Sequence, residues 1–405
     1  MTSGRKRGVL FISNGHGEDL IAARIISRLP ANGTLLISAL PVVGKGRAYE
    51  GLGVGLIDEG REMPSGGFIC NGPRNLAMDL RAGLLAQTRR QIKALKEASP
   101  RTDLAVCVGD CLLLILAGRY LRRPIIFVPT AKSDYVAPHW RIERWLMRHY
   151  CTRVFPRDAL TARSLAGHGI PAEFLGNVMM DALDYTDGRL PSPPNAWRIG
   201  ILPGSRLEAY LNMEDLARAT LALHALSVSQ AADRRITFLV ALAGGLSFSA
   251  LAGNLAPAGW SAEPLEQQTA VSGLQGYLVS RRGGDQPRLA VLQERFADII
   301  AASDVVLGLA GTANEQAVGL GKPVVTFVGR GPQFTTRFLN TQKKLLDGAI
   351  SVVTREPRAI ADEVYSLLFN QTRRETMAGI GRERMGPPGG AGRIAGEIVK
   401  FIKGL

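Results

Sequence analysis

The segment from Ser303 to Pro323 combines residue types that suit binding of a phosphate group. A buried strand (Val305 to Leu309) is followed by a turn of small residues, a short helix and a Gly-Lys-Pro sequence that ends the helix. A small-residue loop that opens a helix presents N–H groups and the positive end of the helix dipole to an anion. A Glu one turn into the helix could accept hydrogen bonds from sugar hydroxyls. The segment therefore predicts a site for a nucleotide-diphosphate ligand.

A second candidate phosphate contact lies at the end of another strand, Ile201-Leu202. Gly204 and Ser205 can offer backbone N–H groups and a hydroxyl, and Arg206 adds a fixed positive charge with bidentate geometry. A plain turn with a surface arginine is the alternative interpretation.

The loop from Asn14 to Asp19 lies between the first strand and the first helix, and its glycines allow close approach of a ligand to the backbone. His16 is a candidate catalytic base, although a histidine in a loop can also be a solvated residue or a cap. The other residues expected at the acceptor side are Asn14, Gly15, Gly17 and Glu18.

Asp110 ends another strand of the first domain and is the second candidate catalytic residue. A carboxylate at the carboxyl end of a parallel strand is well placed for general-base work. It could equally cap the predicted helix from Leu112 to Tyr120.

Three amide side chains are weaker candidates for contact with a ligand. Asn177, after Gly176, is expected to line the gap between domains at the hinge, with an ordinary turn as the alternative. Gln333 and Asn340 follow the strand Val324 to Val328 and could read sugar hydroxyls.

Short apolar strands alternate with helices along the chain, which predicts parallel sheets with helices on both faces. The polar, Pro-rich stretch 186–195 is the expected linker. We predict an α/β protein of two Rossmann-like, doubly wound domains that face across a cleft. The expected parts are a first domain (1–187), a linker (188–197), a second domain (198–385) and a final helical segment (386–405).

Individual elements are predicted from the apolar pattern. A hairpin is expected where two strand-like runs flank a turn-rich segment, residues 281–287. The expected strands are 9–12, 34–39, 104–108, 125–128, 153–155, 198–202, 236–242, 277–279, 289–292, 305–309 and 324–328, and the expected helices include 20–29, 74–98 and 112–120.

The chain of 405 residues carries a formal net charge of +14, which favours a polyanionic partner or, alternatively, reflects free use of surface arginine. Two basic segments, 74–98 and the Trp-containing 140–150, suit the surface of an anionic membrane, but each could simply bury one face against a sheet. The basic residues are scattered and form no nucleic-acid module, so no nucleic-acid partner is expected.

The sequence indicates a cytoplasmic protein. If the two basic segments bind a membrane, the protein is expected to be peripheral on the inner face of the cytoplasmic membrane. The basic start and first apolar run resemble a signal peptide, but the run is short and acidic residues follow at once. No apolar run approaches the ~20 residues that span a bilayer. The four cysteines (Cys70, Cys107, Cys111 and Cys151) form no metal-ligand pattern, and two of them, Cys107 and Cys111, are expected in the core.

Together, these motifs resemble lipid A disaccharide synthase and, above all, the bacterial lipid A disaccharide synthase-related proteins. The similarity to the peptidoglycan GlcNAc transferase and UDP-GlcNAc 2-epimerases is more distant. The segments that carry the resemblance are 202–206, 310–313, 321–323 and 176–177.

The resemblance implies a GT-B type fold, with a UDP-sugar bound as substrate mainly by the second, nucleotide-sugar domain and the acceptor bound by the first domain. It also implies that the C-terminal helix, 386–405, returns toward the first domain, and that no cofactor or metal is needed. It implies that Gly204, Ser205 and Arg206 lie near the nucleotide and that Gly311, Thr312 and Ala313 hold the diphosphate. The transferases' ribose-binding Glu falls on Gln316, beside Glu315, whereas the epimerases carry two carboxylates there. The exact nucleotide therefore stays open.

Three functions are compatible with these patterns. The first is a glycosyltransferase, in which His16 or Asp110 deprotonates a lipid or lipid-linked acceptor. The second is a UDP-sugar 2-epimerase, whose usual carboxylates and histidine are not evident in the first domain. The third is a non-catalytic nucleotide-sugar binding protein, although such a scaffold would be expected to lose its phosphate loops.

Overall fold

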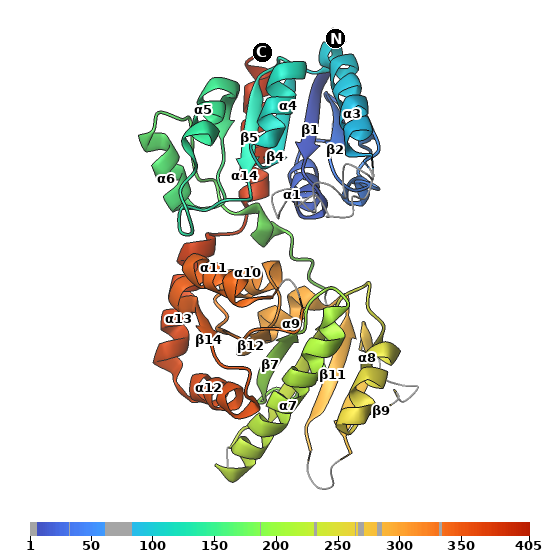
Figure 1. The fold of residues 1–405 in the computed structure, drawn as a ribbon, viewed down its shortest axis with the longest axis vertical. Coiled ribbons are helices and arrows are strands. Elements are labelled where there is room, and N and C mark those ends of the chain that lie inside the picture. Colours follow the sequence, from blue (N-terminus) through green and yellow to red (C-terminus); the bar gives the residue numbers. More distant parts are fainter. Residues whose placement is uncertain are drawn as a thin grey trace. The chain divides into compact units, whose positions relative to one another are not determined.

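The computed structural model describes residues 6–31, 33–60, 83–186, 188–230, 233–263, 265, 271–281, 286–331 and 334–405 (Figure 1). The chain forms two compact units, each with its own sheet. The first contains residues 1–182 and 386–405, and the second contains residues 183–385.

The sheet of the first unit is entirely parallel, as the alternation of strands and helices predicts. Its strand order is β3-β2-β1-β4-β5-β6, so the chain winds outward in both directions from β1 and β4. The strands are β1 (Arg7–Ser13), β2 (Leu35–Pro41), β3 (Gly55–Leu56), β4 (Leu104–Gly109), β5 (Ile125–Pro129) and β6 (Cys151–Val154).

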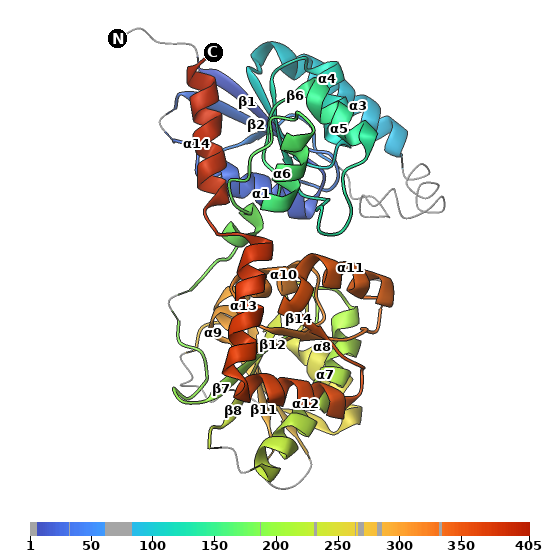
Figure 2. The same cartoon turned by 90° about the vertical axis from the view of Figure 1, so that its left-hand side faces the viewer.

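Alternate residues of β1 point to opposite faces of this sheet, and both faces are covered. Val9 and Phe11 pack against α1 and α14, whereas Leu10 and Ile12 pack on the face covered by α3, α4 and α5 (Figure 2). The helices are α1 (His16–Ile26), α3 (Leu84–Ala98), α4 (Leu112–Tyr120), α5 (Arg141–Tyr150), α6 (Ala159–Gly167) and α14 (Gly390–Lys403), with the short η1 (Arg47–Tyr49), η3 (Ser99–Arg101) and η4 (Val178–Asp181).

The second sheet is mixed and has the order β14-β13-β12-β7-β8-β11-β10-β9. The predicted hairpin is confirmed, because β10 and β11 pair antiparallel. The strands are β7 (Trp197–Leu202), β8 (Ile236–Leu242), β9 (Trp260–Glu263), β10 (Leu274–Ser280), β11 (Arg288–Gln293), β12 (Val305–Gly308), β13 (Val324–Thr326) and β14 (Ile350–Val352).

Helices cover both faces of this sheet as well. The main core lies between the sheet and α7, α8 and α12, and a smaller cluster includes Ile299 of α9. The helices are α7 (Glu208–Ser229), α8 (Phe248–Leu255), α9 (Phe296–Ala302), α10 (Thr312–Gly319), α11 (Thr336–Leu346), α12 (Pro357–Phe369) and α13 (Gln371–Met385), with η5 (Ala256–Ala258) and η6 (Asp347–Ala349).

The second unit begins earlier than the expected linker, because a buried arginine holds the start of it. Arg295 is 1% exposed, and its guanidinium donates to Asp298 Oδ2 (2.7 Å), the Ser272 carbonyl (2.7 Å) and the Gly188 carbonyl (2.6 Å). Asp298 also accepts hydrogen bonds from the N–H and hydroxyl of Thr186. Residues 183–187, expected in the first domain, therefore belong to the second unit.

The last helix, α14, belongs to the first unit. Ile394, Ile398 and Ile402 enter its core, and the Asp181 carboxylate accepts hydrogen bonds from the Gly389 N–H and the Ala391 N–H, the latter at 2.7 Å. Figure 2 shows α14 running along this sheet.

Most predicted elements occur close to their expected bounds. Helix α1 begins at His16 instead of Leu20, so His16 belongs to the first turn of a helix. The part of the predicted 74–98 helix before residue 83 lies outside the described residues, as does Cys70. Cys107 is buried, as expected, whereas Cys111 is half-buried. No helix in the described part of the chain has the length and apolarity that a bilayer crossing requires.

Candidate functional site

Two neighbouring strands of the second unit end together and bring both predicted phosphate loops into contact. Strands β7 and β12 pair in parallel, and the last pair is Leu202 with Gly308. The Leu309 N–H donates to the Leu202 carbonyl at 2.8 Å. Gly204 has φ 114°, a backbone conformation that favours glycine, and a Cβ there would lie 3.4 Å from the Leu309 carbonyl oxygen. The loops 203–206 and 309–312 are therefore adjacent.

The start of α10 is fixed by two buried amide side chains. Asn314 Nδ2 donates to the Gly308 carbonyl and to Gln342 Oε1, both at 3.2 Å. Gln342 Nε2 in turn donates to the Gly311 carbonyl at 3.1 Å. A Cβ on Gly308 would lie 1.9 Å from Asn314 Oδ1, so this position needs glycine. Sequence analysis missed both amides, because the contact of Gln342 with the loop joins segments that are 31 residues apart.

The groups that could face a phosphate lie at the open side of this edge. Arg206 and Ser205 are exposed, and no carboxylate among the described residues pairs with Arg206. Thr312 is exposed and Ala313 is half-buried at the first turn of α10. The first N–H groups of a helix lack intrahelical acceptors, so this turn can donate to an anion.

The two candidate ribose contacts on α10 differ in burial. Gln316 is 7% exposed, whereas Glu315 is half-buried and lies in the first turn. Glu315 is thus the more exposed of the two side chains. Asn340 is exposed on α11, and Gln333 lies outside the described residues.

A neighbouring arginine is already neutralised. Arg330 donates to both carboxylate oxygens of Asp215 (2.7 and 2.8 Å) and to Glu214 (3.0 Å), and the hydrogen bonds to Asp215 raise its pKa. Its backbone N–H donates to Asn212 Oδ1, and Asn212 Nδ2 donates to the Pro203 carbonyl. Arg330 therefore braces the 203–206 loop, whereas Arg206 has no carboxylate partner among the described residues.

In the first unit, the end of β1 carries a buried hydrogen-bonded chain that sequence analysis did not find. Ser13 Oγ donates to Asp19 Oδ1 at 2.5 Å, and because a serine has one proton, Tyr49 donates its hydroxyl to Ser13 at 2.5 Å. Asp19 is 1% exposed, and its Oδ2 has no hydrogen-bond partner among the described atoms. Burial raises the pKa of Asp19 to about 7, which the Ser13 hydrogen bond opposes and the charge of Glu18 reinforces.

Asp110 occupies the same carboxyl edge, at the end of β4. Its carboxylate Oδ1 accepts from the Leu112 N–H at 2.8 Å, as the capping interpretation expects, and its N–H donates to Asn14 Oδ1 at 2.7 Å. Gly109, at φ 143°, must be glycine there because a Cβ would lie 1.8 Å from Asn14 Oδ1. Asp110 and the first loop are thus held together.

The remaining candidate residues of the first loop differ in exposure and contacts. His16 opens α1, but its side chain lies outside the described residues. Glu18 is half-buried and accepts from the Thr130 hydroxyl at 3.3 Å. Gly15 is the N-cap of α1, and a Cβ on Gly17 would meet only open space.

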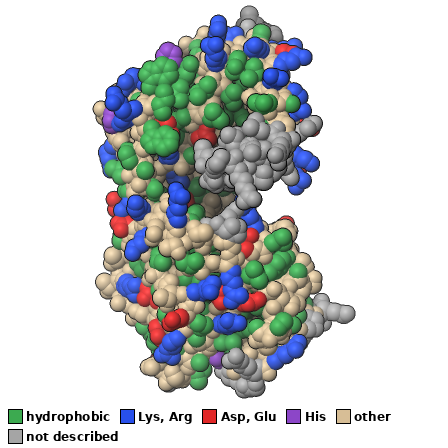
Figure 3. All heavy atoms as spheres, viewed as in Figure 1, with side chains coloured by type: hydrophobic (Ala, Val, Ile, Leu, Met, Phe, Trp, Pro, Cys, Tyr) green, Lys and Arg blue, Asp and Glu red, His purple; other side chains and the backbone are tan. Residues whose placement is uncertain are grey.

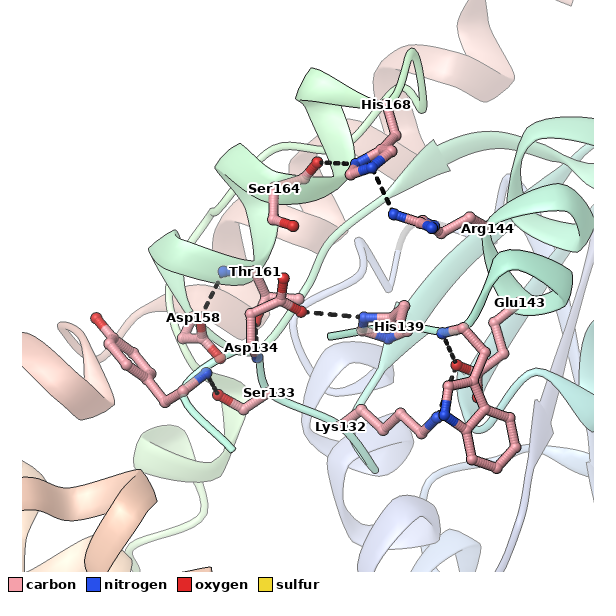
Figure 4. A network of polar contacts seen from close by, with 12 residues as sticks. Lys132, Ser133, Asp134, His139, Glu143, Arg144, Asp158, Thr161, Ser164 and His168 are labelled. Carbon is pink, nitrogen blue, oxygen red and sulfur yellow. Dashed lines mark hydrogen bonds and ion pairs between the residues drawn. The ribbon is translucent and has the colours of Figure 1, made fainter. Parts of the chain in front are cut away.

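The loop that follows β5 at this edge is held by a polar network (Figure 4). His139 Nδ1 lies 3.4 Å from Asp134 Oδ1, and the Asp134 N–H donates to Thr161 Oγ1 at 2.9 Å. Lys132 Nζ lies 2.7 Å from Glu143 Oε2 and 3.8 Å from the centre of the Trp140 ring. The network fixes the segment that joins the sheet edge to α5.

Asn177 is the N-cap of η4, and its Nδ2 has no hydrogen-bond partner among the described atoms. Its side chain is buried, and Oδ1 accepts from the Met179 N–H at 3.1 Å. A Cβ on Gly390 would lie 2.6 Å from the Gly176 carbonyl oxygen, so this turn receives the start of α14. The structure supports the ordinary-turn alternative, because packing of α14 covers the turn.

No group of three or more histidine, cysteine or carboxylate side chains suited to a metal ion occurs among the described residues.

Comparison with known proteins identifies the architecture. No family model matches the chain, and no curated protein does. The fold is similar to that of a UDP-GlcNAc 2-epimerase from Neisseria meningitidis (15% identity, TM-score 0.56, 98% of this chain and 100% of that chain). It is also similar to that of CalG4, the calicheamicin glycosyltransferase (16% identity, TM-score 0.57, 98% of this chain and 99% of that chain). A third similar structure is MurG from Acinetobacter baumannii (14% identity, TM-score 0.57, 97% of this chain and 99% of that chain).

These neighbours share two Rossmann-like domains, so the predicted fold class is confirmed. They include transferases and epimerases alike, so the likeness shows the fold and does not single out lipid A disaccharide synthase. The chain has the GT-B fold of nucleotide-sugar glycosyltransferases and UDP-GlcNAc 2-epimerases.

Proposed function

We propose that this protein is a glycosyltransferase that moves a sugar from a nucleotide-diphosphate donor, of the UDP-GlcNAc kind, to a lipid or lipid-linked acceptor. The observation that carries the proposal is the meeting of the 203–206 and 309–312 loops at the ends of β7 and β12. That edge offers to one diphosphate the N–H groups of α10 and the guanidinium of Arg206, which pairs with no carboxylate in the described part of the chain.

In this mechanism, an acceptor hydroxyl attacks the anomeric carbon of the donor. The bond from that carbon to the diphosphate oxygen breaks, and the diphosphate leaves with the electron pair. Arg206 and the N-terminal amides of α10 stabilise its growing charge. The proton of the hydroxyl passes to His16 or to Asp110, whose Oδ1 already accepts the Leu112 N–H, so Oδ2 is the available oxygen.

An exposed apolar surface on the first unit supports a lipid acceptor and contact with an anionic membrane face. Helix α5 buries Leu146 and Met147 but leaves Trp140 (67% exposed), Ile142 and Trp145 (49% exposed) in solvent. Leu112 and Ile115 on α4 are exposed too, and Figure 3 shows hydrophobic side chains gathered over these two helices. Aromatic and basic residues on one helix suit a membrane interface.

The donor assignment is tested with Arg206→Ala. If its charged hydrogen bonds to the diphosphate form, the variant loses about 1.5–3 kcal/mol of UDP affinity in calorimetry. Arg218→Ala, which removes an exposed arginine on α7, is the matched control. Equal UDP binding by wild type and Arg206→Ala would contradict the assignment.

The first-unit mechanism is tested with Asp110→Ala and His16→Ala. We expect either or both to abolish sugar transfer while UDP binding stays near wild type, because neither residue belongs to the donor unit. Full turnover in both variants would show that the base lies elsewhere. A thermal-shift screen of UDP-, GDP- and ADP-sugars identifies the donor for these assays.

The epimerase is the second candidate, because epimerases are among the structural neighbours and Glu315 is the more accessible of the two α10 residues. An epimerase converts UDP-GlcNAc with no acceptor present, whereas the proposed transferase needs one. Conversion of UDP-GlcNAc alone, followed by NMR, would replace the first proposal with the second.

A further inference from the structure

The first unit has a concave, positively charged surface at the end of its sheet that lies opposite the catalytic candidates. A cavity of about 380 Å³ lies where α3 and α4 end, next to the starts of β4 and β5. The catalytic candidates lie at the carboxyl ends of these strands, so this cavity is separate from them. Its lining residues are Lys96, Ser99, Arg119, Tyr120, Leu121, Arg122 and Arg123.

Four of these seven residues are cations, and none is acidic. No carboxylate in the described part of the chain forms an ion pair with any of the four, Lys96, Arg119, Arg122 and Arg123. Four like charges around one cavity repel one another, and an anion between them would relieve that repulsion. A volume of this size also lies within the range of small-ligand pockets.

Two of the cations are held in place by neutral groups. Arg123 donates through Nε and NH2 to the Ser99 carbonyl at 3.2 and 3.0 Å, and Lys96 Nζ lies 5.6 Å from the centre of the Tyr120 ring. The Ser99 hydroxyl donates to the Leu121 carbonyl at 2.9 Å, which ties the ends of α3 and α4 together. The wall is therefore ordered without a carboxylate neutralising its charge.

Arg122 occupies a backbone position that is unfavourable for an arginine. Its φ is 52°, and its N–H donates to the Ala117 carbonyl at 3.3 Å, which closes the C-terminal end of α4. Glycine is the usual residue at this left-handed position, because a side chain there is strained. Arg122 thus places a charge on the wall of the cavity at a backbone position where glycine would be less strained.

We propose that this cavity is a phosphate-binding site, distinct from the proposed donor site, in which Arg119, Arg122 and Arg123 grip one phosphate group. The ligand is a phosphate ester or pyrophosphate in solution, or the headgroup of an anionic lipid. Guanidinium groups suit either, since their planar donors bind phosphate oxygens in pairs. Figure 3 shows Lys and Arg side chains along the upper edge of the first unit.

The first arm of the test measures inorganic pyrophosphate binding by calorimetry for wild type, Arg122→Gly and Lys93→Ala. Lys93 is an exposed cation of α3 that pairs with Glu97 and does not line the cavity, so its variant controls for the loss of one charge. We expect Arg122→Gly to lose about tenfold in affinity, and Lys93→Ala to stay within about twofold of wild type.

Thermal stability separates binding from folding in the same variants. Because glycine tolerates the left-handed position, Arg122→Gly should melt at the wild-type temperature or above while it binds pyrophosphate more weakly. Arg119→Ala, which changes an exposed side chain on α4, gives a second loss of binding that does not depend on the backbone effect.

Arg206→Ala distinguishes this site from the donor loops. Pyrophosphate binding that persists in Arg206→Ala and disappears in Arg122→Gly belongs to the cavity, whether or not UDP binding changes.

Flotation with phosphatidylglycerol or phosphatidylcholine vesicles identifies the source of the phosphate. Weaker binding of Arg122→Gly to the anionic vesicles alone identifies a headgroup, and unchanged vesicle binding identifies a soluble ligand. If neither pyrophosphate nor vesicles distinguish Arg122→Gly from Lys93→Ala, the proposal is wrong.

Discussion

At the scale of single residues, Asp19 shows how burial can change the chemistry of a loop motif. In the sequence, Asp19 ends the loop that carries the glycines and His16, and nothing in the motif indicates its burial. The structure instead buries it under Ser13 and Tyr49, in a chain that runs from the Tyr49 hydroxyl through Ser13 to Asp19. Its role is to anchor the start of α1 to the end of β1, and thus to position the loop that carries His16.

The pH dependence of stability tests this anchor. The pKa of Asp19 in the folded protein, about 7, lies above its unfolded value of 3.8, so the folded state binds the proton more tightly. The free energy of unfolding should therefore fall as pH rises from about 4 to about 7, by on the order of 2–4 kcal/mol from this group, and then level off.

Asp19→Asn cannot titrate, so the stability advantage of wild type over this variant should shrink across that window. Urea unfolding at about pH 5 and about pH 8 measures it. Glu97→Gln, which changes an exposed carboxylate on α3, should show no such trend. A wild-type advantage that is the same at both pH values would mean that Asp19 is ionised throughout.

At the scale of elements, the apolar pattern predicted the strands well because their burial is nearly continuous. Strand β8 has the predicted bounds, and β4 and β12 differ from prediction by one residue at one end. The two loops that we propose bind phosphate lie where the sequence places them, because glycine and small residues follow β7 and β12 directly. What pattern could not predict were contacts between distant segments, such as Gln342 with Gly311 or Arg330 with Asp215.

Arg295 is the clearest of these long-range contacts, and its substitution tests how the second unit holds residues 186–188. Arg295→Met removes a buried guanidinium and leaves the Gly188 and Ser272 carbonyls without their donor. We expect a loss of about 3 kcal/mol in the free energy of unfolding, measured with urea. Arg288→Met, at an exposed pair with Glu263, should cost less than about 1 kcal/mol. Similar losses in the two variants would argue against a structural role for the Arg295 contacts.

At the scale of the whole molecule, the chain builds the first unit from both of its ends. The expectation that the C-terminal helix returns to the first unit depends on the family resemblance, because its apolar pattern does not indicate which unit it packs against. The structure supplies the reason: the apolar face of α14 fills the surface beside α1, and Asp181 receives the N–H groups at its start. The second unit has its own core and needs no part of α14.

Removal of residues 386–405 should therefore affect the two units unequally. Burial of Ile394, Ile398 and Ile402 contributes about 1.5–3 kcal/mol each, and the sum approaches the whole stability of a typical domain. We expect calorimetry of the truncated protein to lose the transition of the first unit and to keep that of the second. UDP identifies the surviving transition by raising its midpoint, because ligand binding stabilises the unit that holds the donor loops.

Truncation after Lys403 removes only the exposed end and should leave both transitions in place. Loss of both transitions in the longer truncation would mean that the second unit depends on the first for its fold.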